Sequence, residues 1–147
     1  MAKKIFKFNL IELEEFSKKL SKKISLGNII LLKGELGSGK TTLTRFIIKN
    51  LFLINKLKQP KIIPSPTFSL LQEYNLRKFN ICHYDFYRIK NLNEIYELGF
   101  EENIINNISI IEWPNKIINM VEKYHPIIIE IKIIDNNHRI VKILSEN

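Results

Sequence analysis

The chain has 147 residues, 45% of them hydrophobic, with a single cysteine and a formal net charge of +8 at pH 7. Its length and composition predict one globular domain, residues 1–147, with enough core to fold alone. The single cysteine excludes an intrachain disulfide and a cysteine-cluster metal site. Because the sequence shows no signal peptide and no apolar run long enough to cross a bilayer, we expect a cytoplasmic protein without a membrane partner.

The N-terminal segment predicts a strand followed by an amphipathic helix. Residues 5–8 fit a short strand, and Asn9 with Glu12 three positions later resembles a capping box at a helix start. The helix should end near Gly27, and four apolar side chains mark its core-facing side: Leu13, Phe16, Leu20 and Ile24. This periodicity indicates an ordinary core-facing helix.

The next segment carries the most specific pattern in the chain. Residues 28–32 form a short apolar run typical of a buried strand, and residues 34–41 then read Gly-Glu-Leu-Gly-Ser-Gly-Lys-Thr. This sequence matches the phosphate-binding loop G-x-x-x-x-G-K-[ST], and residues 42–51 after it fit a helix with one apolar face. The pattern predicts nucleotide contacts from Gly34, Gly37, Ser38, Gly39, Lys40, Thr41 and Thr42.

Each part of this loop suits the binding of a nucleotide. The glycines allow tight turns and a close approach of the backbone to phosphate. Lys40 is expected to reach the outer phosphates, and Thr41 to offer its hydroxyl to a magnesium ion. The N-terminal end of the following helix adds its positive partial charge to the site.

The rest of the chain alternates strands and helices. Strands are predicted over residues 67–74, 79–87, 108–111, 127–134 and 139–144, the last two joined as a hairpin. Residues 55–66, with three prolines, predict a loop, and helices are predicted over residues 92–98, ending before Gly99, and 116–123. We therefore expect an α/β fold, a three-layer sandwich of the P-loop NTPase type, whose mixed sheet has a parallel core and antiparallel additions.

Two carboxylates at or near strand ends are candidates for the rest of the site. Asp85 lies in His-Tyr-Asp-Phe-Tyr-Arg, and Glu112 lies in Ile-Ile-Glu-Trp-Pro. Phosphoryl transfer needs a metal and a group that orients the attacking nucleophile, and ligands of open α/β sheets bind at strand ends. Either carboxylate alone would more often be a solvated strand end. With the phosphate-binding loop present, both are interpreted as ligand or catalytic groups.

Four other residues have more than one open interpretation each. The Thr67 hydroxyl, behind two prolines in residues 64–67, fits either a switch-like loop that senses the terminal phosphate or a rigid turn. His83 is interpreted as a core or supporting histidine rather than a proton carrier. Trp113 can pack against the nucleotide, a partner or the core, and Cys82 is interpreted as a buried thiol rather than a nucleophile.

The order of these motifs resembles the TsaE family. Five motifs occur in the order of that family: Gly-Glu-Leu-Gly-Ser-Gly-Lys-Thr-Thr, Ser-Pro-Thr-Phe, His-Tyr-Asp-Phe-Tyr-Arg, Glu-Leu-Gly and Glu-Trp-Pro. The resemblance spans nearly the whole chain. It implies a slow ATPase that supports TsaD and TsaB in forming threonylcarbamoyladenosine beside the anticodon of tRNA, with tRNA touched only through the complex.

The resemblance also implies roles for single residues. Lys40 would bind the phosphates of ATP, and Thr41 with Glu112 would bind Mg²⁺. Asp85 would activate or orient water, and Thr67 would lie in the switch-like loop. Trp113 is included among the expected nucleotide contacts.

Three alternatives stay open at this level. A small-molecule kinase shares the phosphate-binding loop, although four scattered arginines poorly supply the arginine-bearing lid of such kinases. A nucleotide-dependent interaction module with little chemistry is disfavoured by the paired acids. Direct RNA binding would use the basic charge, but the heavy use of lysine, isoleucine and asparagine throughout favours a general compositional bias.

Overall fold

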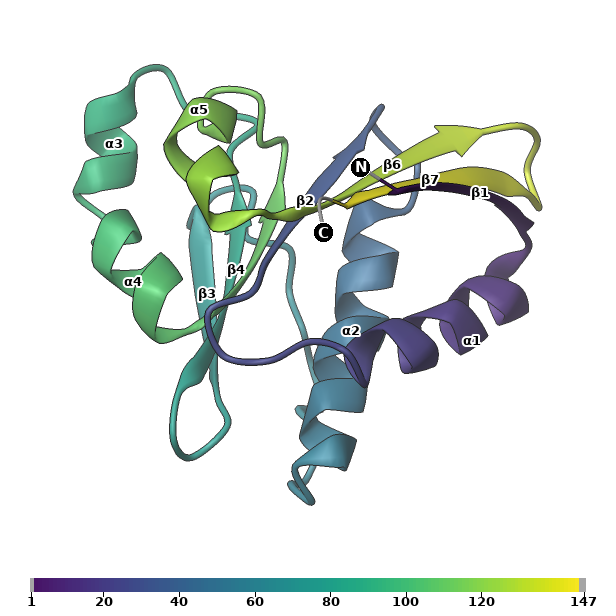
Figure 1. Ribbon diagram of the computed structural model, residues 1–147, viewed down its shortest axis with the longest axis horizontal. Coiled ribbons are helices and arrows are strands. Elements are labelled where there is room, and N and C mark those ends of the chain that lie inside the picture. Colours follow the sequence, from purple (N-terminus) through teal and green to yellow (C-terminus); the bar gives the residue numbers. More distant parts are fainter. Residues whose placement is uncertain (1, 146–147) are drawn as a thin grey trace.

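The computed structural model describes residues 2–145 and is built around one seven-stranded sheet (Figure 1). The strand order is β1-β7-β6-β2-β5-β4-β3. The strands are β1 (Ala2–Phe8), β2 (Ile29–Gly34), β3 (Leu71–Asn75), β4 (Asn80–Asp85), β5 (Ile108–Glu112), β6 (Ile127–Ile133) and β7 (Arg139–Ser145). The helices are α1 (Leu10–Ser21), α2 (Lys40–Ile54), α3 (Leu92–Tyr96), α4 (Phe100–Asn106), α5 (Ile118–Val121) and the 3₁₀ turn η1 (Glu122–Tyr124).

The sheet is parallel at its centre and antiparallel at both sides. Strand β2 pairs in parallel with β5 and β6, and β4 pairs in parallel with β5. Strands β1, β7 and β3 add antiparallel pairs. The predicted mixed sheet with a parallel core is confirmed.

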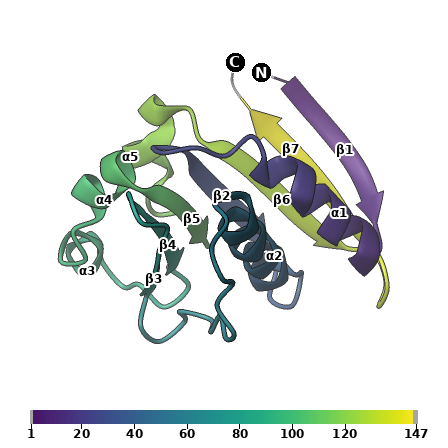
Figure 2. The ribbon, with the colours of Figure 1, turned by 90° about the horizontal axis from the view of Figure 1, so that it is seen from below.

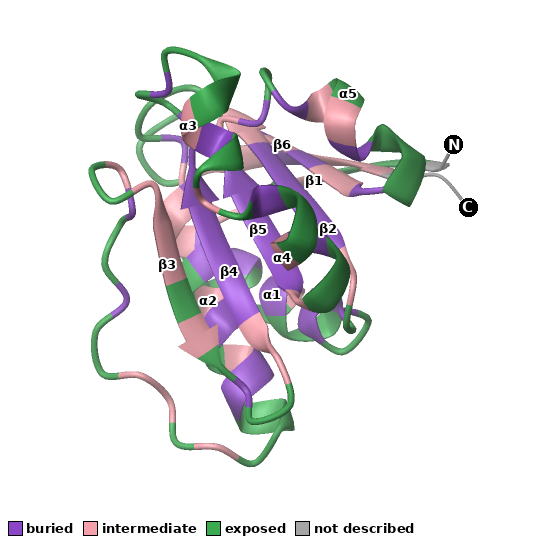
Figure 3. Ribbon diagram, turned by 90° about the vertical axis from the view of Figure 1, so that its left-hand side faces the viewer, coloured by how far each residue is buried: buried purple, intermediate pink, exposed green. Residues whose placement is uncertain are grey.

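Helices cover both faces of the sheet and make three layers. Helices α1 and α2 lie on one face, and α3, α4 and α5 lie on the other (Figures 1 and 2). Alternate residues of β2 enter two different cores, Ile30 and Leu32 on the α1–α2 side and Ile29 and Leu31 on the other. Because both faces are covered, β2, β4 and β5 are almost wholly buried (Figure 3), which explains the continuous apolar run of residues 29–32 in β2.

The start of α1 has the predicted capping box. The Asn9 side chain accepts from the Glu12 amide at 2.8 Å, and the Glu12 carboxylate accepts from the Asn9 amide at 3.1 Å. The helix itself ends at Ser21, earlier than the expected end near Gly27. Ile24 is still buried, because the turn after the helix returns it to the same core.

Two other element predictions need correction. Residues 67–70 form a turn, with the Leu70 amide donating to the Pro66 carbonyl at 2.6 Å, so strand β3 starts only at Leu71. Gly99 does follow a short helix, but its φ of 69° also starts α4, a helix that was not predicted. Phe100 and Ile104, four positions apart and both buried, are the signal for α4 that the sequence carried.

The C-terminal elements follow the predictions more closely. Helix α5 with η1 covers residues 118–124, against the predicted 116–123, and β6 and β7 form the predicted hairpin. Within residues 2–145, no helix is both long and apolar enough to cross a membrane.

Candidate functional site

The candidate site lies where three parallel strands end at one edge of the sheet. In the register of the sheet, Glu112 at the end of β5 is opposite Leu32 of β2 on one side and Asp85 of β4 on the other. The phosphate-binding loop follows β2 directly. The predicted loop and both predicted carboxylates are therefore neighbours, as the carboxyl ends of adjacent parallel strands must be.

Two glycines of the loop are required by its shape. A Cβ on Gly34 would lie 2.5 Å from Ser38 Oγ and 2.6 Å from the Ile131 carbonyl oxygen, so no side chain fits there. Gly39 has a φ of 110°, which L-residues rarely adopt, and it precedes the first turn of α2. The first amides of α2 have no intrahelical acceptor and offer an anion site.

The Lys40 ammonium lies inside the loop and is almost fully buried. Its Nζ donates to the Gly34 carbonyl at 2.8 Å and to the Glu35 carbonyl at 3.0 Å, and it lies 4.1 Å from the ring centroid of Trp113. Burial lowers the pKa of Lys40 below its ordinary 10.5, while the nearby carboxylates of Glu112 and Asp85 oppose that shift.

Glu112 connects the loop to the neighbouring strand. The Thr41 hydroxyl donates to Glu112 Oε1 at 2.8 Å, and His83 Nε2 lies 2.6 Å from Glu112 Oε2. Both His83 and Glu112 are buried. The two carboxylate oxygens thus have different partners, one from α2 and one from β4.

Asp85 is held by the turn that was expected to be a strand. The Thr67 hydroxyl donates to Asp85 Oδ2 at 3.0 Å, and Asp85 Oδ1 accepts from the Tyr87 amide at 2.9 Å. The Ser65 and Thr67 hydroxyls are 2.8 Å apart. Thr67 therefore lies beside the carboxylate that was predicted to orient water.

These groups line one cleft of about 340 Å³. Its walls include the predicted residues Gly37, Gly39, Lys40, Thr41, Thr42, Thr67, Asp85, Glu112 and Trp113. Tyr87 also lines it, with its ring centroid 4.7 Å from that of Trp113. Ser38 differs: its side chain is buried against Gly34, and its amide donates to the Glu35 carbonyl at 3.1 Å.

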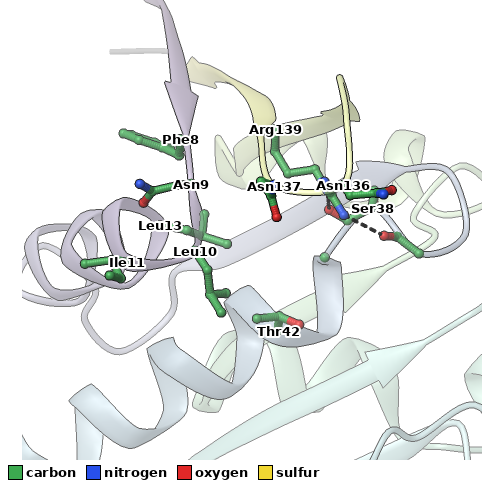
Figure 4. Close-up of a pocket in the computed structure, with 12 residues that line it drawn as sticks. Phe8, Asn9, Leu10, Ile11, Leu13, Ser38, Thr42, Asn136, Asn137 and Arg139 are labelled. Carbon is green, nitrogen blue, oxygen red and sulfur yellow. Dashed lines mark hydrogen bonds between the residues drawn. The ribbon is translucent and has the colours of Figure 1, made fainter.

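A second cavity, of about 600 Å³, lies on the other side of the loop (Figure 4). It shares Gly37, Gly39 and Thr42 with the cleft. Besides Ser38 of the loop, its remaining walls come from the β1–α1 junction and the β6–β7 turn: Phe8, Asn9, Leu10, Ile11, Leu13, Asn136, Asn137 and Arg139. Apart from Ser38, none of these was predicted as a site residue, because segments from opposite ends of the chain share no local pattern.

Arg139 binds the loop to the β6–β7 turn. Its Nε donates to the Ser38 carbonyl at 2.9 Å, and one terminal nitrogen donates to the carbonyls of Asp135 and His138 at 2.7 and 3.0 Å. The other terminal nitrogen lies 3.5 Å from the Gly37 carbonyl oxygen. In the sequence, this residue is one of four arginines at widely separated positions, and only the fold brings it to the loop.

Comparison with known proteins identifies the family of the chain. The family model described as "Threonylcarbamoyl adenosine biosynthesis protein TsaE" matches residues 9–141. The chain belongs to the TsaE family. The resemblance found from its motifs is thereby confirmed.

Members of the TsaE family from two bacteria match most of the chain. A protein of Rickettsia prowazekii (strain Madrid E), named tRNA threonylcarbamoyladenosine biosynthesis protein TsaE, is 45% identical over 137 residues, covering 92% of this chain and 90% of its own. The protein of that name from Aquifex aeolicus (strain VF5) is 35% identical, covering 91% and 92%. The crystal structure of YdiB from Bacillus subtilis matches with a TM-score of 0.68 over all of this chain and 89% of its own; at 21% identity this shows a shared fold.

Proposed function

We propose that this protein binds Mg²⁺-ATP and hydrolyses it as a cytoplasmic subunit of the machinery that forms threonylcarbamoyladenosine in tRNA. The observation that carries the proposal is the meeting of Lys40, Thr41, Glu112 and Asp85 in one cleft. The pathway in the proposal, tRNA threonylcarbamoyladenosine biosynthesis, is taken from the names of the relatives. TsaD-like and TsaB-like proteins are the proposed partners, and tRNA is contacted through them.

The Lys40 ammonium lies where the outer phosphates of ATP would bind in the loop. Lys40 now donates to two loop carbonyls, and we propose that phosphate oxygens replace them as acceptors. The ring of Trp113 stays behind the ammonium and keeps water from that side.

The donors beside the loop fit a magnesium ion. Mg²⁺ prefers oxygen ligands, and Thr41 offers a hydroxyl beside the Glu112 carboxylate. When bound, the ion neutralises charge on the phosphate oxygens. Thr41 and Glu112 would hold it.

Asp85 is the proposed group for orienting the attacking water. Both of its oxygens accept hydrogen bonds from the protein, one from the Thr67 hydroxyl and one from a backbone amide, so its direction is set. Thr67, on its short turn, would adjust Asp85 when the terminal phosphate arrives or leaves.

The second cavity is the proposed place for the base and sugar. It joins the cleft across Gly37, Gly39 and Thr42, so a nucleotide can extend from one into the other. Phe8, Leu10 and Ile11 supply apolar surface for a base, and Asn136 and Asn137 supply polar groups.

The arginines favour a partner-stimulated ATPase over a small-molecule kinase. None of the residues lining the cleft, within the described residues 2–145, is an arginine. Arg45 donates to the Ile63 carbonyl, Arg88 stacks over Phe68, and Arg139 binds loop carbonyls. A catalytic arginine supplied in trans raises turnover about a thousandfold or more in related chemistry, which agrees with slow hydrolysis by the isolated protein.

Phosphate release from labelled ATP tests this function. The protein alone should release free phosphate slowly, and TsaD-like with TsaB-like proteins should accelerate it. Lys40→Ala should lower turnover by ~100-fold or more, whereas Lys49→Ala on the exposed side of α2 should not. Label that appears on an acceptor molecule would instead establish a kinase, and equal turnover with and without partners would refute the subunit role.

A further inference from the structure

His83 is a buried polar residue whose contact with the site is set by its place in the sheet. It lies on β4, where it is fully buried, and in the register of the sheet it lies between Ile110 of β5 and Gln72 of β3. Its Nε2 lies 2.6 Å from Glu112 Oε2. A buried polar side chain destabilises a fold unless it is well paired, and the contact with Glu112 provides this pairing for Nε2.

The two nitrogens of His83 have different surroundings. Nδ1 has no hydrogen-bond partner within the described part of the chain, while Nε2 faces a carboxylate. An ionised carboxylate only accepts, so Nε2 must carry the proton and donate. In the neutral imidazole, Nδ1 is then the acceptor nitrogen, with a lone pair and no hydrogen to donate.

This hydrogen bond leaves Glu112 with little rotational freedom. His83 holds Oε2 from β4, and Thr41 donates to Oε1 from the start of α2. Two donors from different elements fix the plane of the carboxylate. Oε1, which accepts from Thr41, is thus in contact with the last residue of the phosphate-binding loop.

We propose that His83 is a positioning residue that aims the Glu112 carboxylate at the metal of the bound nucleotide. The inference rests on the proposed role of Glu112 in binding Mg²⁺. His83 itself touches neither nucleotide nor metal. Its effect is to present one oxygen of Glu112 in a single orientation, as partners behind metal ligands do.

Two amide variants separate positioning from packing. In His83→Gln the amide nitrogen can take the place of Nε2 and still donate to Glu112. In His83→Asn the amide is one methylene shorter, reaches only the place of Nδ1, and leaves Glu112 Oε2 without its donor. Both variants bury an uncharged amide at the same position, so their effects on folding should be similar. Circular dichroism and thermal unfolding check this match.

The decisive measurement is binding rather than turnover. Affinity for a fluorescent, non-hydrolysable ATP analogue is measured in EDTA and in a series of Mg²⁺ concentrations, and Mn²⁺ bound with the analogue is counted by electron paramagnetic resonance. His83→Asn should weaken the metal-dependent part of the affinity by about 10–100-fold and leave the affinity in EDTA unchanged. His83→Gln should stay within a few-fold of the unmodified protein.

A double-variant cycle completes the test. In a Glu112→Gln background, His83→Asn should add almost nothing to the loss of metal-dependent binding, because the group it positions has been changed. Equal metal dependence in the Gln and Asn variants, or fully additive losses in the cycle, would overturn the inference. If the unmodified protein itself shows no Mg²⁺-dependent binding, the proposed function fails instead, so the two failures are distinguishable.

Discussion

Thr41 Oγ1 and Glu112 Oε1 lie 2.8 Å apart, although 71 positions separate the two residues in the chain. The parallel pairing of β2 with β5 produces this contact, because it places Glu112 opposite Leu32, just before the loop that contains Thr41. A hydroxyl from the phosphate-binding loop and a carboxylate from the neighbouring strand thus meet at one point of the site. The parts of the site can be tested one at a time.

Substitution of the two carboxylates should change different kinetic quantities of ATP hydrolysis. Glu112→Gln should raise the Mg²⁺ concentration for half-maximal ATP hydrolysis by about tenfold or more, because it weakens a proposed metal ligand. Asp85→Asn should lower kcat with little change in the Mg²⁺ concentration for half-maximal hydrolysis, because it alters the group that is proposed to orient the attacking water. Turnover measured across a Mg²⁺ series compares them, with Glu101→Gln at an exposed position of α4 as control. The reverse order would mean that the two roles are exchanged.

Arg139 should control how well the loop binds ATP. Arg139→Gln removes donors to the Ser38 and Gly37 carbonyls, and hydrogen bonds from charged groups contribute ~1.5–3 kcal/mol. We expect KM for ATP to rise by about tenfold with a much smaller change in kcat. Steady-state kinetics measure both, and Arg77→Gln in the exposed β3–β4 turn is the matched control. An unchanged KM would show that the loop keeps its shape without this arginine.

The second cavity should recognise the nucleoside rather than the phosphates. Leu10 lines it and is 61% exposed, so Leu10→Ala removes apolar surface that a base would cover. Affinity for ATP should fall by about three- to tenfold, while affinity for inorganic tripolyphosphate stays the same. Calorimetric titration of both ligands provides the comparison. Leu26→Ala, at another exposed leucine, should change neither, and a parallel loss for both ligands would place the base elsewhere.

Cys82 should be unreactive in the folded protein. It is fully buried, and burial raises the pKa of its thiol to about 12, with Glu73 acting in the same direction. Because its pKa is raised, the folded protein keeps the neutral thiol, which is a poor nucleophile, at any pH below about 9. An aromatic disulfide reagent at pH 8 should label the denatured chain quickly and the native chain at least ~100-fold more slowly. Fast labelling of the native protein would contradict the buried position.

Local patterns in the sequence were sufficient to predict much of this protein. The phosphate-binding loop, the capping box at Asn9, the mixed sheet and the motifs of the TsaE family depend on residues a few positions apart. Such signals come from helix periodicity, turn chemistry and glycine backbone freedom, all of which act over short distances. Both candidate carboxylates were found in the same way, as polar groups that end apolar strands.

The tertiary structure decided how these residues meet. Strand order and register bring Asp85 beside Glu112, the turn at residues 67–70 carries the Thr67 hydroxyl to Asp85, and the fold delivers Arg139 to the loop. The second cavity joins the β1–α1 junction to the β6–β7 turn, segments from opposite ends of the chain. No local pattern encodes such distant contacts, since they depend on how strands pair and helices pack across the whole sheet.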